Sequence, residues 1–208
     1  MTLMKHPVMR VGIMLALFAI IATSLVTLTE SNTHDKILDN EKQALLKAIN
    51  TLVASNDYDN DIITDVISLP RAEQLGTHDV STVYRARKAN QPVAAIFTSI
   101  APNGYNGKIK LLVGVYYDGS LAGVRVISHK ETPGLGDKID EKKADWIRQF
   151  EGLSLSRPAQ SDWKVKKDGG QFDQFTGATI TPRAVVKAVK NALHFFEENR
   201  DDLFKEVE

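Results

Sequence analysis

The chain has 208 residues, with 26 basic and 26 acidic side chains, no cysteine and 43% hydrophobic residues. This length suits one domain of ordinary size with an appendage. The balanced charge provides no basic field, so we predict no nucleic-acid partner. Without cysteine, the chain forms no disulfide, ligates no iron–sulfur cluster and performs no thiolate catalysis.

An uncharged apolar segment, residues 11–29, lies near the N-terminus. As a helix it would span about 28 Å, close to the hydrocarbon thickness of a bilayer. The alternatives are a cleaved signal peptide, whose apolar region is usually only about 7–15 residues long, and a buried soluble helix, which is rarely apolar all round. We therefore predict one transmembrane helix.

The charges on either side of this segment predict its orientation. Lys5 and Arg10 precede it, whereas Glu30 and Asp35 follow it. By the positive-inside rule, residues 1–10 are cytoplasmic and the soluble domain is outside. In a Gram-negative cell the protein would be a single-pass protein of the inner membrane, with its domain on the periplasmic side.

The soluble part begins with a helical pattern and continues with strand patterns. Apolar residues at helical spacing predict a connector over residues 30–56, helical over 31–53, either as a separate helix or as a continuation of the membrane helix. The domain is expected over residues 57–199, followed by a charged tail at 200–208. Runs rich in β-branched and aromatic residues predict strands over 65–68, 82–87, 93–100, 110–117 and 122–128. Turns at 101–104 and 118–120 favour antiparallel pairing.

The second half of the domain is expected to mix helices with one short strand. The pattern predicts helices over 140–150 and 182–199 and a strand over 163–167. Trp146 and Trp163 are interpreted as core residues, because aromatic side chains dominate cores. The predicted fold is α+β, with a mostly antiparallel sheet flanked by helices and one transmembrane helix before it.

The segment DQFTGATITP, residues 173–182, places a small-residue turn and several hydroxyls before the last helix. Thr181 suits the N-cap position and Pro182 the first helical position. Gly177 and Ala178 allow close backbone approach, and the free N–H groups of a helix start favour an anion. On these grounds alone the segment is either a phosphate seat or merely a capped turn before a surface helix.

A second loop, HKETPGLGDK at residues 129–138, follows a predicted strand. Gly134 and Gly136 permit a ligand to approach the backbone, and Leu135 offers an apolar face. The alternative is a glycine-rich turn without a ligand. No metal site is predicted, because His129 has no ligand spacing with the other histidines.

The pattern Asp-x-x-Thr-Gly-Ala-Thr resembles the flavinylation motif of the FMN-binding domain family. The loop at 129–138 and the segment GYNGKI at 104–109 resemble two further elements of that family, in the expected order. The resemblance implies one covalent FMN per chain, held through a phosphoester on Thr179 that a separate flavin transferase installs. Asp173 would serve that transfer or fix the turn.

The same resemblance places a lysine just before a Gly-Gly pair near the flavin. In this chain Asp168 directly precedes Gly169, so either Lys166 or Lys167 is the candidate, and Arg183 is a further phosphate candidate. The complete set of candidate FMN-binding residues is Thr179, Asp173, Thr176, Gly177, Ala178, Thr181, Glu131, Thr132, Gly134, Leu135, Gly136, Lys166 and Lys167.

Taken along nearly its whole length, the chain resembles the G-subunit family of Rnf-type ion-translocating electron-transport complexes. The resemblance implies an electron-carrying subunit rather than an enzyme on its own. Its partners would be the other membrane and peripheral subunits of a complex that couples electron transfer between ferredoxin and NAD to ion transport. Two alternatives stay open: the C-subunit family of sodium-translocating NADH:quinone reductases, which is typically longer, and a membrane-anchored assembly or binding protein without a redox cofactor.

Overall fold

The computed structural model describes residues 7–78 and 80–205. The chain divides into two compact units, Met1–Leu45 and Leu46–Glu208, and helix α1 (Pro7–Asn50) begins in the first and ends in the second. Within α1, the 23 residues Val8–Glu30 have a mean hydropathy of 2.5 and exposed side chains, so this stretch is long and apolar enough to cross a membrane. It contains the predicted span at 11–29. Residues 1–6 of the predicted N-terminal segment lie outside the described residues.

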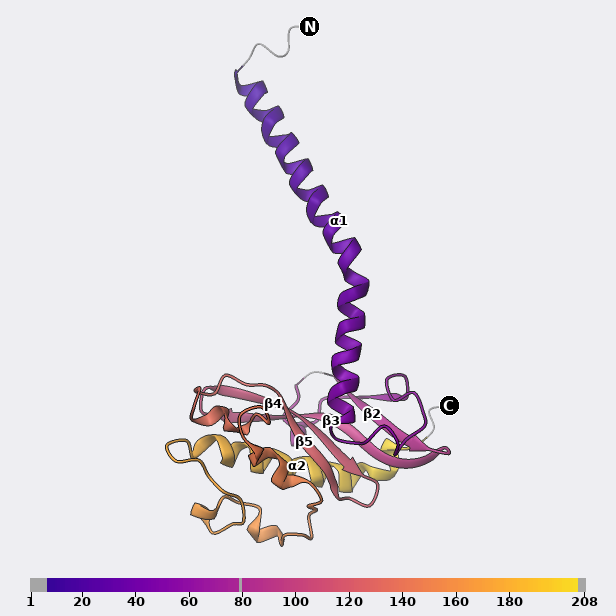
Figure 1. The fold of residues 1–208 in the computed structure, drawn as a ribbon, viewed down its shortest axis with the longest axis vertical. Coiled ribbons are helices and arrows are strands. Elements are labelled where there is room, and N and C mark those ends of the chain that lie inside the picture. Colours follow the sequence, from indigo (N-terminus) through magenta and orange to yellow (C-terminus); the bar gives the residue numbers. More distant parts are fainter. Residues whose placement is uncertain (1–6, 79, 206–208) are drawn as a thin grey trace. The chain divides into compact units, whose positions relative to one another are not determined.

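The second unit is built on one five-stranded sheet (Figure 1). Its strands are β1 (Val66–Leu69), β2 (Ser81–Lys88), β3 (Gln91–Gly104), β4 (Gly107–Tyr116) and β5 (Leu121–Ser128). They lie in chain order, and each pairs antiparallel with the next. This arrangement confirms the antiparallel sheet, because short links between β-branched runs favour pairing of neighbours.

The turn predicted at residues 101–104 is wrong. Strand β3 continues to Gly104 and pairs with Gly107, so Tyr105 and Asn106 form the turn of the hairpin. The register shifts between Ala101 and Gly104, around Pro102. A bulge accommodates proline within a strand, because proline has no N–H to donate to the ladder.

Helix α2 (Ile180–Leu203) lies along one face of the sheet, as the yellow helix in Figure 1 shows. Its apolar stripe packs on β3, where Phe195 meets Phe97 edge to face at 5.7 Å between ring centroids. The predicted helix over 182–199 is thus present, and it is longer at both ends. Of the predicted tail at 200–208, Leu203 and Phe204 are buried against the domain, whereas residues 206–208 lie outside the described residues.

Between β5 and α2 the described chain forms only short 3₁₀ helices. They cover Gly136–Ile139, Asp145–Phe150, Gln160–Asp162 and Lys166–Asp168, and another, Glu73–Leu75, precedes β2. The helix predicted over 140–150 is therefore wrong in its first half. The Asp140 carboxylate accepts the N–H of Lys142 at 2.9 Å, a local bond that competes with the helical pattern.

The strand predicted over 163–167 is also wrong. Val165 forms only an isolated bridge with Phe172, and the chain turns back at Gly169, whose φ is +82°. Trp163 is 3% exposed in the core, and Trp146 packs on the core while partly exposed. The core assignment is therefore confirmed for Trp163, whereas Trp146 lies at the edge of the core.

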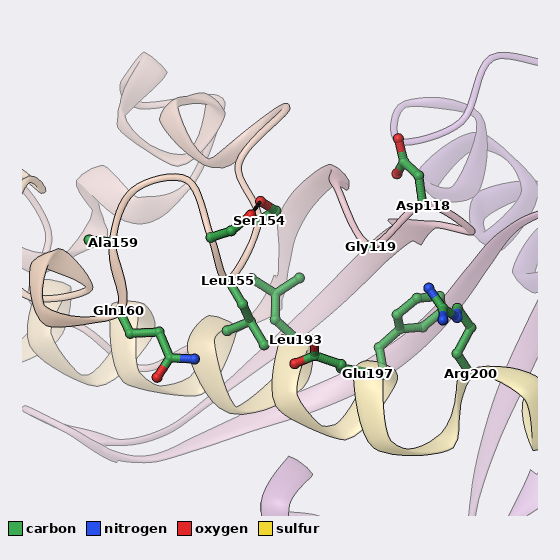
Figure 2. A pocket seen from close by; sticks show the side chains of 11 residues that line it. Asp118, Gly119, Ser154, Leu155, Ala159, Gln160, Leu193, Glu197 and Arg200 are labelled. Atoms are coloured by element: carbon green, nitrogen blue, oxygen red, sulfur yellow. Dashed lines mark hydrogen bonds between the residues drawn. The ribbon is translucent and has the colours of Figure 1, made fainter.

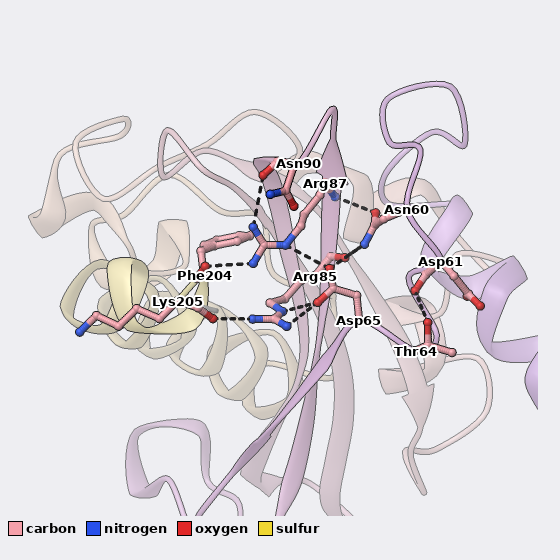
Figure 3. A network of polar contacts seen from close by, with 9 residues as sticks. All are labelled: Asn60, Asp61, Thr64, Asp65, Arg85, Arg87, Asn90, Phe204 and Lys205. Atoms are coloured by element: carbon pink, nitrogen blue, oxygen red, sulfur yellow. Dashed lines mark hydrogen bonds and ion pairs between the residues drawn. The ribbon is translucent and has the colours of Figure 1, made fainter. Parts of the chain in front are cut away.

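An ionic network with little exposure to solvent ties the end of α2 to the sheet (Figure 3). Arg85 and Arg87 of β2 both pair with Asp65, with N–O distances of 2.5 and 3.0 Å. The same guanidinium groups donate to the main-chain oxygens of Lys205 and Phe204, each at 2.9 Å. We name this the Asp65 cluster. It joins three segments that are far apart in the sequence.

Candidate functional site

Three segments that the sequence singled out meet in one pocket of about 290 Å³. The β3–β4 turn, the loop after β5 and the start of α2 each form one wall. The lining residues are Tyr105, Glu131, Thr132, Leu135, Gly136, Gly177, Ala178, Thr179, Ile180 and Thr181. The volume is just below the roughly 300–1,000 Å³ typical of small-molecule sites.

A buried carboxylate joins the three walls. Glu131 is 4% exposed and accepts a hydrogen bond from the hydroxyl of Thr181, which is fully buried. The carboxylate also accepts the main-chain N–H groups of Tyr105, at 3.3 Å, and Asn106, at 3.0 Å. A further bond joins two walls directly, from the Asn106 amide to the Thr132 hydroxyl at 3.1 Å. We call Glu131 and its three donors the Glu131 cluster.

Two glycines leave room for this carboxylate. A Cβ at Gly136 would lie 2.8 Å from the Thr181 hydroxyl and 2.9 Å from Glu131 Oε2. A Cβ at Gly104 would clash with the Gly107 main-chain oxygen and lie 2.9 Å from Glu131 Oε1. All of these approaches are too close for a carbon atom, so a larger residue at either position would force the cluster to shift. Gly136 thus makes space for the Glu131 and Thr181 side chains, and Gly104 makes space for Glu131 and for the main chain of its own hairpin.

Thr179 is the N-cap residue of α2, and Thr181 is not. The predicted cap at Thr181 is therefore wrong, because its hydroxyl is committed to the buried acceptor Glu131. Thr179 is half-buried and its side chain makes no capping hydrogen bond. It lines the pocket beside the free N–H groups at the start of a 24-residue helix. Such a helix start attracts an anion such as a phosphate.

The rim of the pocket is apolar. Tyr105, Leu135 and Ile180 are exposed although they are large hydrophobic residues. Gly177 has φ of +81°, and a Cβ there would lie 3.5 Å from Leu135. The pocket thus combines a polar end at the helix start with an apolar rim, which suits a ligand with a phosphate and a flat ring.

Five of the predicted residues do not line the pocket: Asp173, Thr176, Gly134, Lys166 and Lys167. Asp173 forms an exposed ion pair with Lys166 at 2.6 Å, and its main-chain oxygen accepts the indole N–H of Trp146 at 2.8 Å. The Lys167 N–H donates to the Gln174 side chain at 3.1 Å. These contacts shape the loop that leads to Thr179.

Asp168, the departure from the family pattern, has a partner in the first turn of α2. Nε and Nη2 of the Arg183 guanidinium donate to its carboxylate, at 2.6 and 2.5 Å. These bonds hold the pKa of Asp168 below its ordinary value and raise the pKa of Arg183. Arg183 is thus neutralised within the chain and does not line the pocket.

A second pocket, of about 370 Å³, lies toward the other end of α2 (Figure 2). The turn at Asp118 and Gly119, the loop around Ser154 and the helix face of Leu193 and Arg200 surround it. No predicted motif contributes to this pocket. Among the described residues, no group of three or more His, Asp or Glu side chains could hold a metal ion.

Sequence reasoning missed two lining residues of the first pocket, Tyr105 and Ile180. The signal for Tyr105 was present, since it lies in the segment at 104–109 that resembles a family element. Ile180 follows Thr179 directly and would be expected in the core from its type, yet it is exposed.

Comparison with known proteins agrees with this geometry. Residues 104–194 match the FMN-binding domain family, and residues 2–52 match the RnfG N-terminal region. The chain is 48% identical to the G subunit of the ion-translocating oxidoreductase complex of Shewanella baltica, over 97% of this chain and 95% of that protein. It is 47% identical to the protein of the same name from Pseudoalteromonas atlantica, over 97% and 94% of the two chains. For the protein of the same name from Vibrio cholerae the identity is 46%, over 92% and 91%. The chain therefore belongs to the G-subunit family of ion-translocating oxidoreductase complexes.

Proposed function

We propose that this protein is an electron-carrying subunit of a membrane-bound complex and holds one FMN through a phosphoester on Thr179. The complex would couple electron transfer between ferredoxin and NAD to ion translocation. The observation that carries the proposal is the pocket itself, where three family elements converge on a threonine at a helix start. The names of the relatives support the assignment to an ion-translocating oxidoreductase.

The residues present fit FMN. The helix start and the hydroxyl of Thr179, which makes no capping bond, suit the phosphate, and Thr132 offers a polar contact. The exposed side chains of Tyr105, Leu135 and Ile180 suit the flat ring. When bound, FMN supplies one-electron transfer between donors and acceptors in partner subunits. The chain contributes attachment, orientation and an apolar contact surface.

Attachment requires a separate flavin transferase and an activated donor. In the proposed step, the Thr179 oxygen bonds to the flavin phosphorus and the pyrophosphate bond of a flavin dinucleotide breaks. A nucleoside monophosphate leaves, and the hydroxyl proton passes to a base of the transferase. Thr179 is therefore a modification site, and no electron is transferred in this reaction.

The membrane topology is part of the proposal. The apolar stretch Val8–Glu30 would anchor the chain as a single-pass protein in the bacterial inner membrane. Basic residues before it and acidic residues after it favour a periplasmic location for the FMN-binding domain, proposed over 57–199. A covalent bond suits that location, because a dissociated cofactor would be lost to an open compartment.

Intact-mass analysis of the full chain, co-expressed with a flavin transferase, tests the proposal. We expect a mass gain of one FMN less one water, and a fluorescent band on a denaturing gel. Thr179→Val should fold and lack both signals, whereas Thr98→Val, at a half-buried threonine of β3 outside the pocket and the motif, should keep them. A wild-type chain with the unmodified mass would contradict the proposal and favour an assembly protein without a redox cofactor.

A further inference from the structure

We propose that Glu131 is a positioning residue for flavin attachment, because its buried carboxylate fixes the first turn of α2 against the other two pocket walls. This inference rests on the proposed function of Thr179. It adds a residue that acts on the reaction through Thr181, without touching the reacting atoms. The Glu131 cluster and its place in the fold support this role.

The cluster joins segments that are distant in the sequence. Glu131 bonds to main-chain groups 25 and 26 residues before it and to a side chain 50 residues after it. Thr181 lies two residues beyond Thr179, in the same helical turn. The bond from Thr181 to Glu131 therefore holds this turn in place. If the bond is lost, the turn can move, and the Thr179 hydroxyl moves with it relative to the loop after β5.

The bonding pattern requires a carboxylate. Three donors point at its two oxygens: the Thr181 hydroxyl and the Tyr105 N–H at Oε2, and the Asn106 N–H at Oε1. An ionised carboxylate only accepts hydrogen bonds, so it satisfies all three. Glutamine has one oxygen and one NH₂ group, and in either orientation its NH₂ faces a main-chain N–H. Glu131→Gln thus keeps the shape of the side chain but loses the hydrogen bond to one of the two main-chain N–H groups.

Within the part of the chain that the structure describes, no ion pair neutralises the Glu131 carboxylate. Among the described residues, no Lys, Arg or His side chain forms an ion pair with Glu131, which only uncharged donors hold. A buried charge without a counterion is costly and rarely serves stability alone. Since Glu131 also lines the pocket, its charge acts on whatever the pocket holds.

Two variants separate geometry from charge. Thr181→Val removes the hydroxyl while the carboxylate and its charge stay. Glu131→Gln removes the charge and keeps most of the volume. We expect both to slow flavin attachment by about 10- to 100-fold, the usual effect of a small misplacement of a reacting group. Thr181→Ser should restore the rate, because it restores the donor.

The test uses the full chain in detergent, purified without flavin and then supplied with a flavin transferase and a flavin dinucleotide. The initial rate of attachment is measured against the concentration of the chain. We expect kcat to fall in Thr181→Val and Glu131→Gln while KM changes little, because the transferase still recognises the same loop. In chains that are finally loaded, Glu131→Gln should raise the flavin potential, because a negative charge in the pocket wall is lost, and Thr181→Val should leave it near the wild-type value.

Ser99→Ala is the matched control. Ser99 is also fully buried and also donates a hydroxyl hydrogen bond to α2, at the Ala188 oxygen, 3.4 Å away and outside the pocket. We expect a wild-type rate from this variant. Equal slowing by Ser99→Ala, or wild-type rates for both Thr181→Val and Glu131→Gln, would overturn the positioning role. A wild-type chain that accepts no flavin would instead refute the proposed function. If Glu131→Gln does not fold, the Thr181→Val and Thr181→Ser pair still decides the question.

Discussion

Two carboxylates in this domain tie together distant segments, and they do so with opposite chemistry. Asp65 is paired with two arginines, and those arginines hold the main-chain oxygens of residues 204 and 205. Glu131 is held by one hydroxyl and two main-chain N–H groups, with no cation among the described residues. The Asp65 cluster locks the C-terminal end of α2 to the sheet, whereas the Glu131 cluster lies beside the first turn.

The difference shows that the partners of a carboxylate shielded from solvent, whether cations or neutral donors, indicate its role. A carboxylate that is fully compensated by cations secures the fold, because removing either partner leaves an unpaired charge inside the protein. A carboxylate held only by neutral donors keeps its charge available, and here it forms part of a pocket wall. We therefore expect changes in the Asp65 cluster to affect stability, and changes in the Glu131 cluster to affect flavin attachment more than stability.

The largest effect on stability is expected from Asp65→Ala. The substitution leaves the guanidinium groups of Arg85 and Arg87 buried without their carboxylate, which should lower the free energy of unfolding by about 3–5 kcal/mol. Urea unfolding of the full chain in detergent, followed by tryptophan fluorescence, measures the loss. The flavin content of the chains that fold should be unchanged. A stable Asp65→Ala protein with little flavin would reverse the roles of the two clusters.

A smaller loss is expected from Gly136→Ala, which intrudes on the Glu131 cluster. The added Cβ would lie 2.8 Å from the Thr181 hydroxyl, and such overpacking should cost about 1–3 kcal/mol. The rate of flavin attachment should fall by a larger factor than in a variant outside the cluster that loses a similar free energy of unfolding. Gly152→Ala is the control, because its φ is +75° and nothing lies within 4 Å of its Cβ, so it adds backbone strain alone. Equal flavin loading in both variants would contradict a special role for the Glu131 cluster.

The sequence was sufficient for the parts of the fold that local patterns determine. The β-branched runs, the turn at 118–120 and the apolar stripe of α2 each depend on neighbouring residues, and all are present in the structure. The errors lie where a side chain or a glycine overrides the pattern. The Asp140 carboxylate bonds to a nearby N–H instead of allowing a full helix, and Gly169 reverses the chain before a strand can pair.

The candidate site also has features that local motifs predict and features that depend on distant contacts. Contiguous motifs pointed to the pocket, because the residues that would contact a ligand lie next to each other in the chain. The role of Glu131 was not visible, since it depends on contacts with residues 25 to 50 positions away. The N-cap prediction for Thr181 is wrong for the same reason. The acceptor of its hydroxyl, Glu131, lies 50 residues earlier in the chain, in the loop after β5.

A modest effect on the flavin is expected from Lys167→Ala. Lys166 is already paired with Asp173, whereas no ion pair of Lys167 is found within the described part of the chain. If Lys167 is the lysine near the flavin, its charge favours the reduced cofactor, so the variant should have a lower potential at unchanged occupancy. A redox titration of loaded protein, with Lys166→Ala beside it, measures the shift. An equal potential in Lys167→Ala and the wild type would discard this role.

The smallest effect is expected from the exposed pair of Asp168 and Arg183, which lies outside both clusters. The Arg183 guanidinium lowers the pKa of Asp168 in the folded chain below its ordinary value of 3.8. The pair therefore stabilises the fold above pH 3.8, and this contribution is lost as the pH falls through the lowered folded pKa. We expect Asp168→Asn to be slightly less stable than the wild type at neutral pH, with the difference vanishing in acid. Arg183→Gln should give the same small loss, and the double variant no further loss, since each removes the same interaction. A difference that persists below the folded pKa would show that Asp168 acts through contacts other than its charge.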